Sequence, residues 1–563
     1  MTETISTENK GGYKTIVYFI CFVAAMGGFL FGLDQGFIAN ALDTIEGVYH
    51  IGIAGGEDYS KILAIGGIFG ALLSGIFARF LGRKKSLILA GFIFTFASVY
   101  SALLPPINIL SALRFLLGFG VGVASFIVPL YLSETAPAKI RGSMGTLFQL
   151  LITIGIFLIS LSNVFIAKYF VDPKTSLPLM FIFVAIFAGL MFLGTFILPE
   201  SPRWLMLVGK RKEAEVVLQK TLSNQEEIDL ELFDIEEALK GPKNDSEKGI
   251  TFGLFFKVLL VGIFLQVFQQ LVGINMMIYY APTIFGFAGI TGLLGMMTVP
   301  TVNMLFTFPA ISLVEKWGRK MLLYVGAVCM LIKMLAAGYC FMEISKISAP
   351  AETALNSFYK NINQEQLTIT VENLKGIKFV KVSESIQTPE IQQMLADYKA
   401  HQATPEVEPA EQKLVTKLKE AVSKAMAKDL APMVPSEIKW ILLIAIIIYI
   451  FGFAVSWGPV AWLVCSEIFP IKYREIGMTV TTMVNWTFAG LVMGNALTFM
   501  QQHGNASIFF VFGGFCIIAI LFVAVFVPET KGITLEEMEL NLRDGKALRD
   551  LGTPPTDQTC RLD

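Results

Sequence analysis

The stretch LGRKKS at residues 81–86 returns as WGRKML at residues 317–322. A second stretch, SETAPAKIRG at 133–142, returns as SEIFPIKYRE at 466–475. Long apolar segments lie between these charged motifs in both parts of the chain. Paired basic motifs that separate two sets of apolar segments indicate a duplicated membrane protein, and parallel repeats of this kind are typical of transport proteins.

The composition of the 563-residue chain agrees with a membrane protein. Hydrophobic residues make up 54% of it and charged residues 16%, which is too apolar for a soluble domain of this length. The formal net charge of -1 gives no indication of nucleic-acid binding. The six cysteines lack metal-ligand spacing, and the three histidines lie outside or at the ends of the apolar segments. We therefore expect no metal, no cofactor and no enzymatic activity.

Apolar stretches of roughly 20 residues predict about twelve membrane spans. They lie near residues 15–40, 61–80, 86–105, 109–132, 143–168, 177–198, 254–286, 290–314, 321–343, 438–463, 476–500 and 507–527. The first is too long for a secretory signal peptide and lacks a cleavage site. The sequence therefore predicts an all-α protein in a lipid bilayer, with two pseudo-symmetric halves of six helices. Because the basic residues fall in alternate connections, we expect those loops and both termini to be cytoplasmic.

The spacing between the repeats locates an insertion. The first motif repeats after roughly 236 residues and the second after roughly 333. The polar stretch 344–436, between spans nine and ten, accounts for the difference and is expected on the outer side. Residues 367–382 have the pattern of a β-hairpin and residues 410–430 that of a helix, so we expect a small α/β module. Two readings stay open: a packing module, or a segment that acts as a lid, captures substrate or binds an unknown partner.

These observations divide the chain into six parts. They are an N-terminal half at 1–198, a cytoplasmic linker with short helices at 199–253, helices seven to nine at 254–343, the insert at 344–436, helices ten to twelve at 437–532, and a cytoplasmic tail at 533–563.

Five further motifs carry a resemblance to a known family. They are RFLLGFGVG (114–122), PESPRW (199–204), QVFQQLVGIN (266–275), GPVAW (458–462) and PETKG (528–532). In this order they resemble the sugar porter branch of the major facilitator superfamily, which includes bacterial xylose–proton and galactose–proton symporters. The resemblance covers nearly the whole chain and implies import of a monosaccharide, a hexose or pentose, by alternating access. A facilitative sugar or polyol uniporter and a sugar sensor are the alternatives.

Asp34 lies deep in the first span. A carboxylate there is costly unless it is paired or protonated, which makes it a functional candidate. Arg114 in the fourth span is a permanent cation and its natural partner, although a fixed ion pair could serve only to lock two helices together. In the family's proton symporters, matching Asp and Arg residues form the coupling site, so the resemblance implies proton symport. The retained acid resembles bacterial members and implies an inner membrane.

The sugar is expected at the midplane between the halves. Amide side chains both donate and accept hydrogen bonds, as sugar hydroxyls do, and aromatic rings suit the sugar's C–H faces. A buried amide could instead only bridge helices. The resemblance assigns sugar binding to Phe31, Gln149, Gln269, Gln270, Asn275, Tyr280, Asn303, Trp462, Asn485 and Trp486. Tyr279 and Tyr280 resemble the family's external gate.

Acidic and basic residues also recur at corresponding places near the basic loops. The basic residues alone would satisfy the positive-inside rule, but acid–base pairs suggest ion pairs between helices that close the cytoplasmic side. The expected gate residues are Glu134, Arg141, Glu200, Arg203, Glu315, Arg319, Glu467 and Arg474. The first basic motif departs from the family pattern, because Arg79 stands where an acidic or polar residue is usual. This leaves inter-helix pairing at that motif in question.

Overall fold

The computed structural model describes residues 15–137, 140–222, 224–240, 251–290, 292–362, 434–470, 473–533 and 535–553. Within these ranges the secondary structure is helical and contains no strand. The first half consists of α1 (Thr15–Tyr49), α2 (Gly52–Phe80), α3 (Arg83–Ser101), α4 (Ile107–Thr135), α5 (Arg141–Tyr169) and α6 (Pro173–Thr195). Three short helices follow: α7 (Pro202–Leu207), α8 (Arg211–Thr221) and α9 (Gln225–Lys240).

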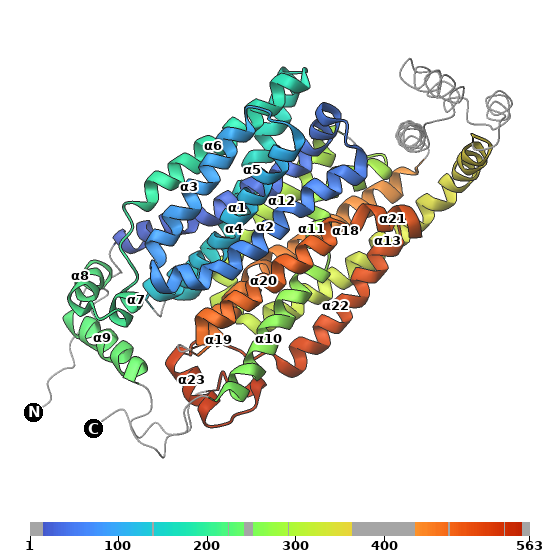
Figure 1. Cartoon of the computed structure of the whole chain (residues 1–563). Helices are drawn as coiled ribbons and strands as arrows, with labels where there is room; N and C mark the ends of the chain where they lie inside the picture. The colour runs from blue at the N-terminus through green and yellow to red at the C-terminus, as the bar shows by residue number, and fades with distance from the viewer. Residues whose placement is uncertain are drawn as a thin grey trace, which may run out of the picture.

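The second half has more helices because three of its spans are broken. It comprises α10 (Phe252–Leu271), α11 (Ile274–Phe287), α12 (Gly292–Trp317), α13 (Arg319–Ile362), α18 (Ser436–Val455), α19 (Trp457–Ile468), α20 (Arg474–Met493), α21 (Ala496–His503) and α22 (Ser507–Phe526). After it come α23 (Leu535–Arg543) and a 3-10 turn at Leu548–Asp550. The two halves lie side by side, and α7, α8, α9 and α23 lie at one end of the bundle (Figure 1).

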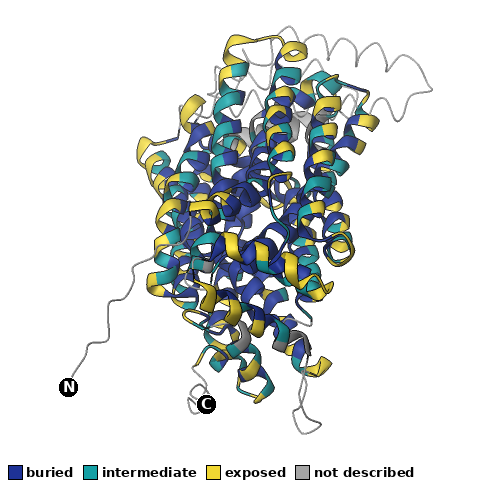
Figure 2. Ribbon diagram, turned by 90° about the vertical axis from the view of Figure 1, so that its left-hand side faces the viewer, coloured by how far each residue is buried: buried dark blue, intermediate teal, exposed yellow. Residues whose placement is uncertain are grey.

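The described helices confirm the expected all-α membrane fold. Eleven spans are long and apolar enough to cross a bilayer. The twelfth, α3, has 19 residues and begins with three basic residues, which lower its hydropathy; it packs between α4 and α6. Buried residues fill the interior between the helices, whereas exposed residues lie on the outside (Figure 2). Many of those exposed side chains are large and apolar, as expected for a surface in contact with lipid.

The breaks divide spans that the hydropathy predicts as continuous. Helices α10 and α11 meet at Gly273, whose φ of +96° is left-handed, and an added Cβ would lie 2.6 Å from the Phe512 ring. Helices α18 and α19 meet at Ser456, and α20 and α21 meet at Gly494 and Asn495. Broken helices expose backbone polar groups, which a membrane protein tolerates only where other groups satisfy them.

The helix of span nine extends past the expected start of the insert. The apolar span ends at Ile347, close to residue 344, and helix α13 continues to Ile362. Both the expected hairpin at 367–382 and the expected helix at 410–430 lie outside the described residues.

Candidate functional site

The buried ion pair between α1 and α4 is the first element of the site. Nη1 of Arg114 donates to Oδ1 of Asp34 at 2.5 Å, and the two side chains are 0% and 3% exposed. Arg114 also lies over the Tyr59 ring, 5.4 Å from its centroid. Within the described residues, Oδ2 of Asp34 and both Nε and Nη2 of Arg114 have no hydrogen-bond partner. A buried pair joined by one hydrogen bond leaves costly groups unsatisfied, so it is poorly suited to a purely stabilising role.

A chain of buried amides crosses the interior from α1 to α20. Nε2 of Gln35 donates to Asn275 at 3.3 Å, and Nδ2 of Asn275 donates to Gln270 at 2.5 Å. Nε2 of Gln270 donates to Gln269 at 3.2 Å, and Nδ2 of Asn485 also donates to Gln269, at 2.5 Å. The chain therefore connects four of the expected sugar-binding amides with Gln35, which belongs to the opposite half.

Two members of this network were not expected from the sequence. Gln35 directly follows Asp34, and Gln266, which accepts a hydrogen bond from Asn485 at 2.6 Å, lies one turn before Gln270. The i, i+4 spacing of Gln266 and Gln270 could have identified the former, because residues at this spacing share one face of a helix. No comparable signal marks Gln35, whose partner is 240 residues away.

Interior side chains also bond to backbone carbonyls near two of the helix breaks. Nε2 of Gln269 donates to the carbonyls of Trp457 and Gly458 at the start of α19, both at 3.2 Å. The Tyr449 hydroxyl donates to the carbonyl of Val272 at 2.9 Å, at the α10–α11 break. The network thus holds the half-helices in place, so a ligand that competes for these amides would change the packing of the half-helices.

Aromatic residues adjoin the amides from both halves. The rings of Phe31 and Trp486 lie 5.1 Å apart, and those of Phe148 and Trp462 lie 6.3 Å apart in an edge-to-face arrangement. Nε1 of Trp486 donates to the Ser125 hydroxyl at 3.1 Å, which links the two halves. Each of these two ring pairs therefore joins one half to the other.

The remaining expected sugar-site residues lie apart from the amide chain. Gln149 of α5 faces the start of α19, since a Cβ on Gly458 would lie 3.3 Å from its Nε2. Asn303 is buried, and neither of its amide atoms has a hydrogen-bond partner among the described residues. The Tyr280 hydroxyl donates to the carbonyl of Met493 at 2.5 Å, so it contacts the α20–α21 break, while Tyr279 is buried beside it with a ring distance of 6.5 Å.

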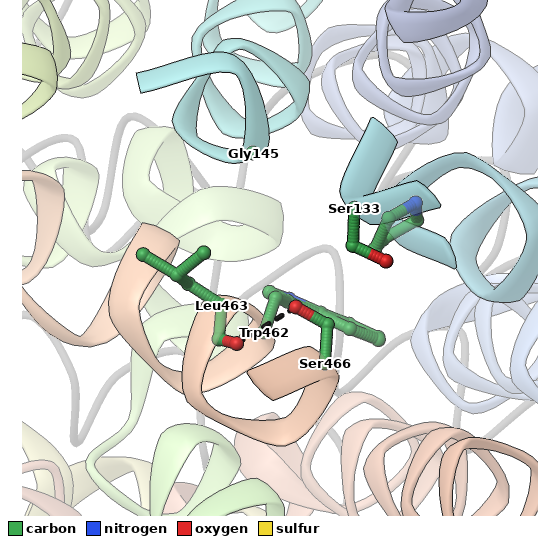
Figure 3. Close-up of a pocket in the computed structure, with 6 residues that line it drawn as sticks. Ser133, Gly145, Trp462, Leu463 and Ser466 are labelled. Carbon is green, nitrogen blue, oxygen red and sulfur yellow. Dashed lines mark hydrogen bonds between the residues drawn. The ribbon is translucent and has the colours of Figure 1, made fainter. Parts of the chain in front are cut away.

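A small cavity lies toward the basic loops, between α4, α5 and α19. It is lined by Pro129, Ser133, Gly145, Trp462, Leu463 and Ser466 (Figure 3). The space open to the centre of a water-sized sphere is about 10 Å³, which is about enough for one water molecule. Ser133 and Ser466 come from matching positions of the repeated SE motifs. This cavity is too small for a sugar.

At the basic end of the first half, Arg83 is the central residue. It forms a bidentate pair with Glu134, with both N–O distances 2.8 Å, and the Ser201 hydroxyl donates to the same carboxylate at 2.6 Å. Glu200 accepts from the backbone N–H groups of Arg83 and Lys84 at 2.8 and 3.1 Å. Burial raises the pKa of Glu200, although these hydrogen bonds oppose the effect.

The second half repeats this arrangement residue by residue. Arg319 donates to Glu467 at 2.9 Å, and the Thr530 hydroxyl donates to Glu467 at 2.6 Å. Glu529 accepts from the backbone N–H groups of Arg319 and Lys320 at 2.9 and 3.0 Å. Gly82 and Gly318, with φ of +86° and +84°, permit the same turn before each arginine. The pseudo-symmetry seen in the motifs therefore extends to individual hydrogen bonds.

The two basic ends differ in which helix supplies the second carboxylate near the central arginine. In the second half, Glu315 accepts from Arg319 at 3.3 Å and approaches Gly142 of α5. In the first half, Arg79 occupies the place of that acid, and Glu475 of α20 supplies the carboxylate from the other half, 3.2 Å from Arg83. The first motif is therefore paired despite its departure from the family pattern, through an acid we did not assign to the gate.

The other expected gate residues have different partners. Arg203 lies 3.6 Å from Glu231 of α9, and Nε of Arg474 donates to the carbonyl of Phe469 at 3.3 Å. The side chain of Arg141 lies outside the described residues. Most of the described pairs lie within one half, whereas Arg83–Glu475 joins the two halves.

Comparison with known proteins places this architecture in a family. The model of the family described as "Sugar (and other) transporter" matches residues 20–358 and 422–542. The chain is 33% identical to the galactose-proton symporter of Escherichia coli strain K12, over 96% of this chain and 97% of that protein. It is 29% identical to the arabinose-proton symporter of the same strain, over 95% of each.

Solved structures give the same result for the fold. A proton:xylose symporter of the major facilitator superfamily, bound to 6-bromo-6-deoxy-D-glucose, superposes with a TM-score of 0.69 at 26% identity, covering 93% of this chain and 98% of that one. With two repeated halves, a broken-helix interior and a family match over most of its length, this chain belongs to the sugar porter family of the major facilitator superfamily, a family of transporters and not of enzymes.

Proposed function

We propose that the protein imports a monosaccharide, a hexose or a pentose, together with protons by alternating access. The named activities of the galactose and arabinose symporters support this substrate class. The observation that carries the proposal is the buried, singly bonded pair of Asp34 and Arg114. We further propose that the protein lies in a bacterial inner membrane, with the basic end and both termini in the cytoplasm.

Protonation of Asp34 would act through the charge of Arg114. A neutral Asp34 no longer offsets the buried guanidinium, whose Nε and Nη2 already lack partners among the described residues. The free energies of the outward- and inward-facing states then change relative to each other, because the states differ in how they solvate this charge. The same pair re-forms when Asp34 releases its proton on the other side.

The sugar and proton sites are adjacent on α1. Asp34 is bonded to α4, and the next residue, Gln35, is bonded to Asn275 of α11. A rotation or shift of α1 that follows Asp34 protonation therefore alters the amide network directly. Conversely, sugar hydroxyls that replace amide–amide hydrogen bonds would move α1 and its carboxylate, as reciprocal coupling requires.

Binding of the sugar would exchange one set of hydrogen bonds for another. The amides of Gln269, Gln270, Asn275 and Asn485 now bond to one another and to backbone carbonyls. Each can donate to and accept from a sugar hydroxyl, so the exchange leaves few groups unsatisfied. Phe31 and Trp486 would cover an apolar face of the ring.

Transport by reconstituted protein tests the proposal. Purified protein in proteoliposomes would receive radiolabelled galactose, xylose and arabinose outside the vesicles. Uptake would be measured with a pH gradient, acidic outside, and without one. We expect uphill accumulation of at least one sugar only with the gradient, and its loss on addition of a protonophore. Asp34→Asn should abolish accumulation but keep sugar exchange. Asp58→Asn, at an exposed carboxylate paired with Lys61, is the matched control and should transport normally.

Two results would contradict the proposal. Accumulation by Asp34→Asn equal to that of the unmodified protein would exclude Asp34 as the coupling group. Equilibration without accumulation in the unmodified protein, under any gradient, would favour the facilitative uniporter.

A further inference from the structure

The break between α20 and α21 exposes the first N–H groups of α21. Helix α21 begins at Ala496, and Asn495 occupies the position of its N-cap with φ of -139° and ψ of -8°. An asparagine there usually caps the helix with its side-chain oxygen. Here the Asn495 side chain forms no cap, and its Nδ2 instead donates back to the carbonyl of Leu491 at 2.8 Å. The N-terminus of α21 therefore needs an acceptor from elsewhere.

That acceptor is Glu57, which belongs to α2 in the opposite half. Its Oε1 accepts from the backbone N–H of Leu497 at 3.0 Å and of Thr498 at 3.4 Å. Its Oε2 accepts from the Thr498 hydroxyl at 2.5 Å. Glu57 is 3% exposed, and the first N–H groups of a helix are a favourable site for an anionic group. A carboxylate more than 400 residues away in the chain thus acts as the N-cap.

Other contacts hold the same break. The Tyr280 hydroxyl donates to the carbonyl of Met493, the last residue of α20, so the break is bonded on its N-terminal side as well. Among the described residues, no ion pair connects Glu57 to a cation, and the nearby Lys61 is paired with Asp58. In the part of the chain that the structure describes, the Glu57 carboxylate thus accepts hydrogen bonds only from α21, and movement of α21 away from α2 would break them.

The break also separates two roles along one span. Asn485 and Trp486, which join the amide chain and the aromatic group, lie on α20. Helix α21 lies on the side away from the basic loops, and the regular backbone hydrogen-bond ladder is interrupted between it and α20. The half-helix that Glu57 caps is thus the part of the span nearest the outer opening.

We propose that Glu57 is a positioning residue of the outer gate, which caps α21 across the two halves in the closed state and releases it when the gate opens. This rests on the alternating-access function proposed above. In the closed state Glu57 and the α21 N–H groups are buried and satisfy each other. In the open state water satisfies both, so the bond can break without leaving buried polar groups unpaired.

The direct test is a distance across the outer end. Spin labels would be attached to cysteines introduced at Leu103, in the loop after α3, and at Gln502 on α21. The six native cysteines would be replaced by serine. Leu103 is 70% exposed and Gln502 is also exposed, so both positions accept a label. We expect Glu57→Ala to raise the ratio of long to short label–label distances at least tenfold. A tenfold change in an equilibrium corresponds to about 1.4 kcal/mol, and a single hydrogen bond to a charged group can contribute that much.

Graded variants separate capping from general destabilisation. Glu57→Gln retains an oxygen that can accept from Leu497, so it should shift the distances less than Glu57→Ala. Thr498→Val removes only the hydroxyl bond and should give an intermediate shift. Asp58→Asn is the matched control and should give none. If Glu57→Ala does not fold, Glu57→Gln and Thr498→Val still test the proposal.

A functional readout distinguishes positioning from a structural role. Opening of the outer gate favours binding from outside, so Glu57 variants should lower the KM for external sugar and lower the maximal rate together, which loss of folded protein alone would not do. Unchanged distance distributions in Glu57→Ala, Glu57→Gln and Thr498→Val would overturn the proposal. If the unmodified protein transported no sugar while Glu57→Ala still lengthened the distance, the proposed transport function would be contradicted and the proposed role of Glu57 at the gate would be supported.

Discussion

Replacement of Glu475 by glutamine tests whether the pair between the halves closes the basic end. The Arg83–Glu475 pair joins α3 to α20, with an N–O distance of 3.2 Å. The substitution keeps the size of the side chain and removes its charge. Arg83 keeps its bidentate bond to Glu134, so no buried charge loses its last partner.

The magnitude follows from the burial of the two partners. The Arg83 side chain is 5% exposed and that of Glu475 is 25% exposed. An exposed ion pair contributes less than about 1 kcal/mol, whereas a buried hydrogen bond to a charged group contributes about 1.5–3 kcal/mol. We expect a loss of about 1 kcal/mol from the closed form. This is about a fivefold increase in the ratio of open to closed forms at the basic end.

The assay is the alkylation rate of a cysteine placed at Ser466, which lines the small cavity and is 2% exposed. The protein would be in detergent, without its native cysteines, so that both ends are accessible. We expect Glu475→Gln to react about fivefold faster than its parent. Glu213→Gln is the matched control and should not change the rate, because Glu213 of α8 forms an exposed pair with Lys210.

Equal rates in Glu475→Gln and its parent would refute the reasoning that this pair closes the basic end. A parallel measurement separates the pairs within one half from the pair between halves. Glu134→Gln breaks a buried bidentate pair inside the first half and should cost about 3–5 kcal/mol of stability. We therefore expect it to lower the melting temperature strongly, with no selective increase in the alkylation rate.

Gly273→Ala places a Cβ at a left-handed φ and against Phe512, so it should lower the free energy of unfolding by at least about 1 kcal/mol. The melting temperature in detergent should fall accordingly, and an unchanged melting temperature would refute the backbone argument. Asn485→Ala removes two hydrogen bonds to the amides of α10 and should weaken sugar binding about tenfold by equilibrium binding, whereas undiminished affinity would place the sugar elsewhere. A hydrogen bond from Thr175 lowers the pKa of Asp172, so Asp172→Ala should destabilise the protein at neutral pH. This difference should disappear as the pH falls through the lowered pKa, and a difference that persists in acid would contradict the assignment.

Much of the fold and part of the site could be predicted from local sequence. The spans follow from hydropathy summed along the chain, and the repeated motifs mark two halves in which matching arginines bond to matching glutamates at the basic ends. Asp34 and Arg114 are recognisable because a charge within an apolar span is rare. The contact between them follows once the fold brings α1 against α4.

The partners of several charges and amides could not be predicted in this way. From the sequence, Glu475 is one more acid in a cytoplasmic loop motif; only the packing of α20 against α2 brings it to Arg83 at the start of α3. In the sequence, Gln35 is marked only as the neighbour of Asp34. The fold places Asn275 of α11 3.3 Å from its Nε2. In each case the deciding contact joins residues hundreds of positions apart, from different halves.

The sequence by itself determined that this protein has two related sets of membrane helices, with one carboxylate deep in the first span. Hydropathy and helical spacing are properties of neighbouring residues, and they suffice for this. Only the tertiary structure decided where the second-half helices break and which groups satisfy the exposed backbone, such as Glu57 for the first N–H groups of α21 and Tyr449 for the carbonyl of Val272 after α10. The physical reason is that a broken helix is stable in a membrane protein only when distant groups complete its hydrogen bonds, and the fold alone brings those groups together.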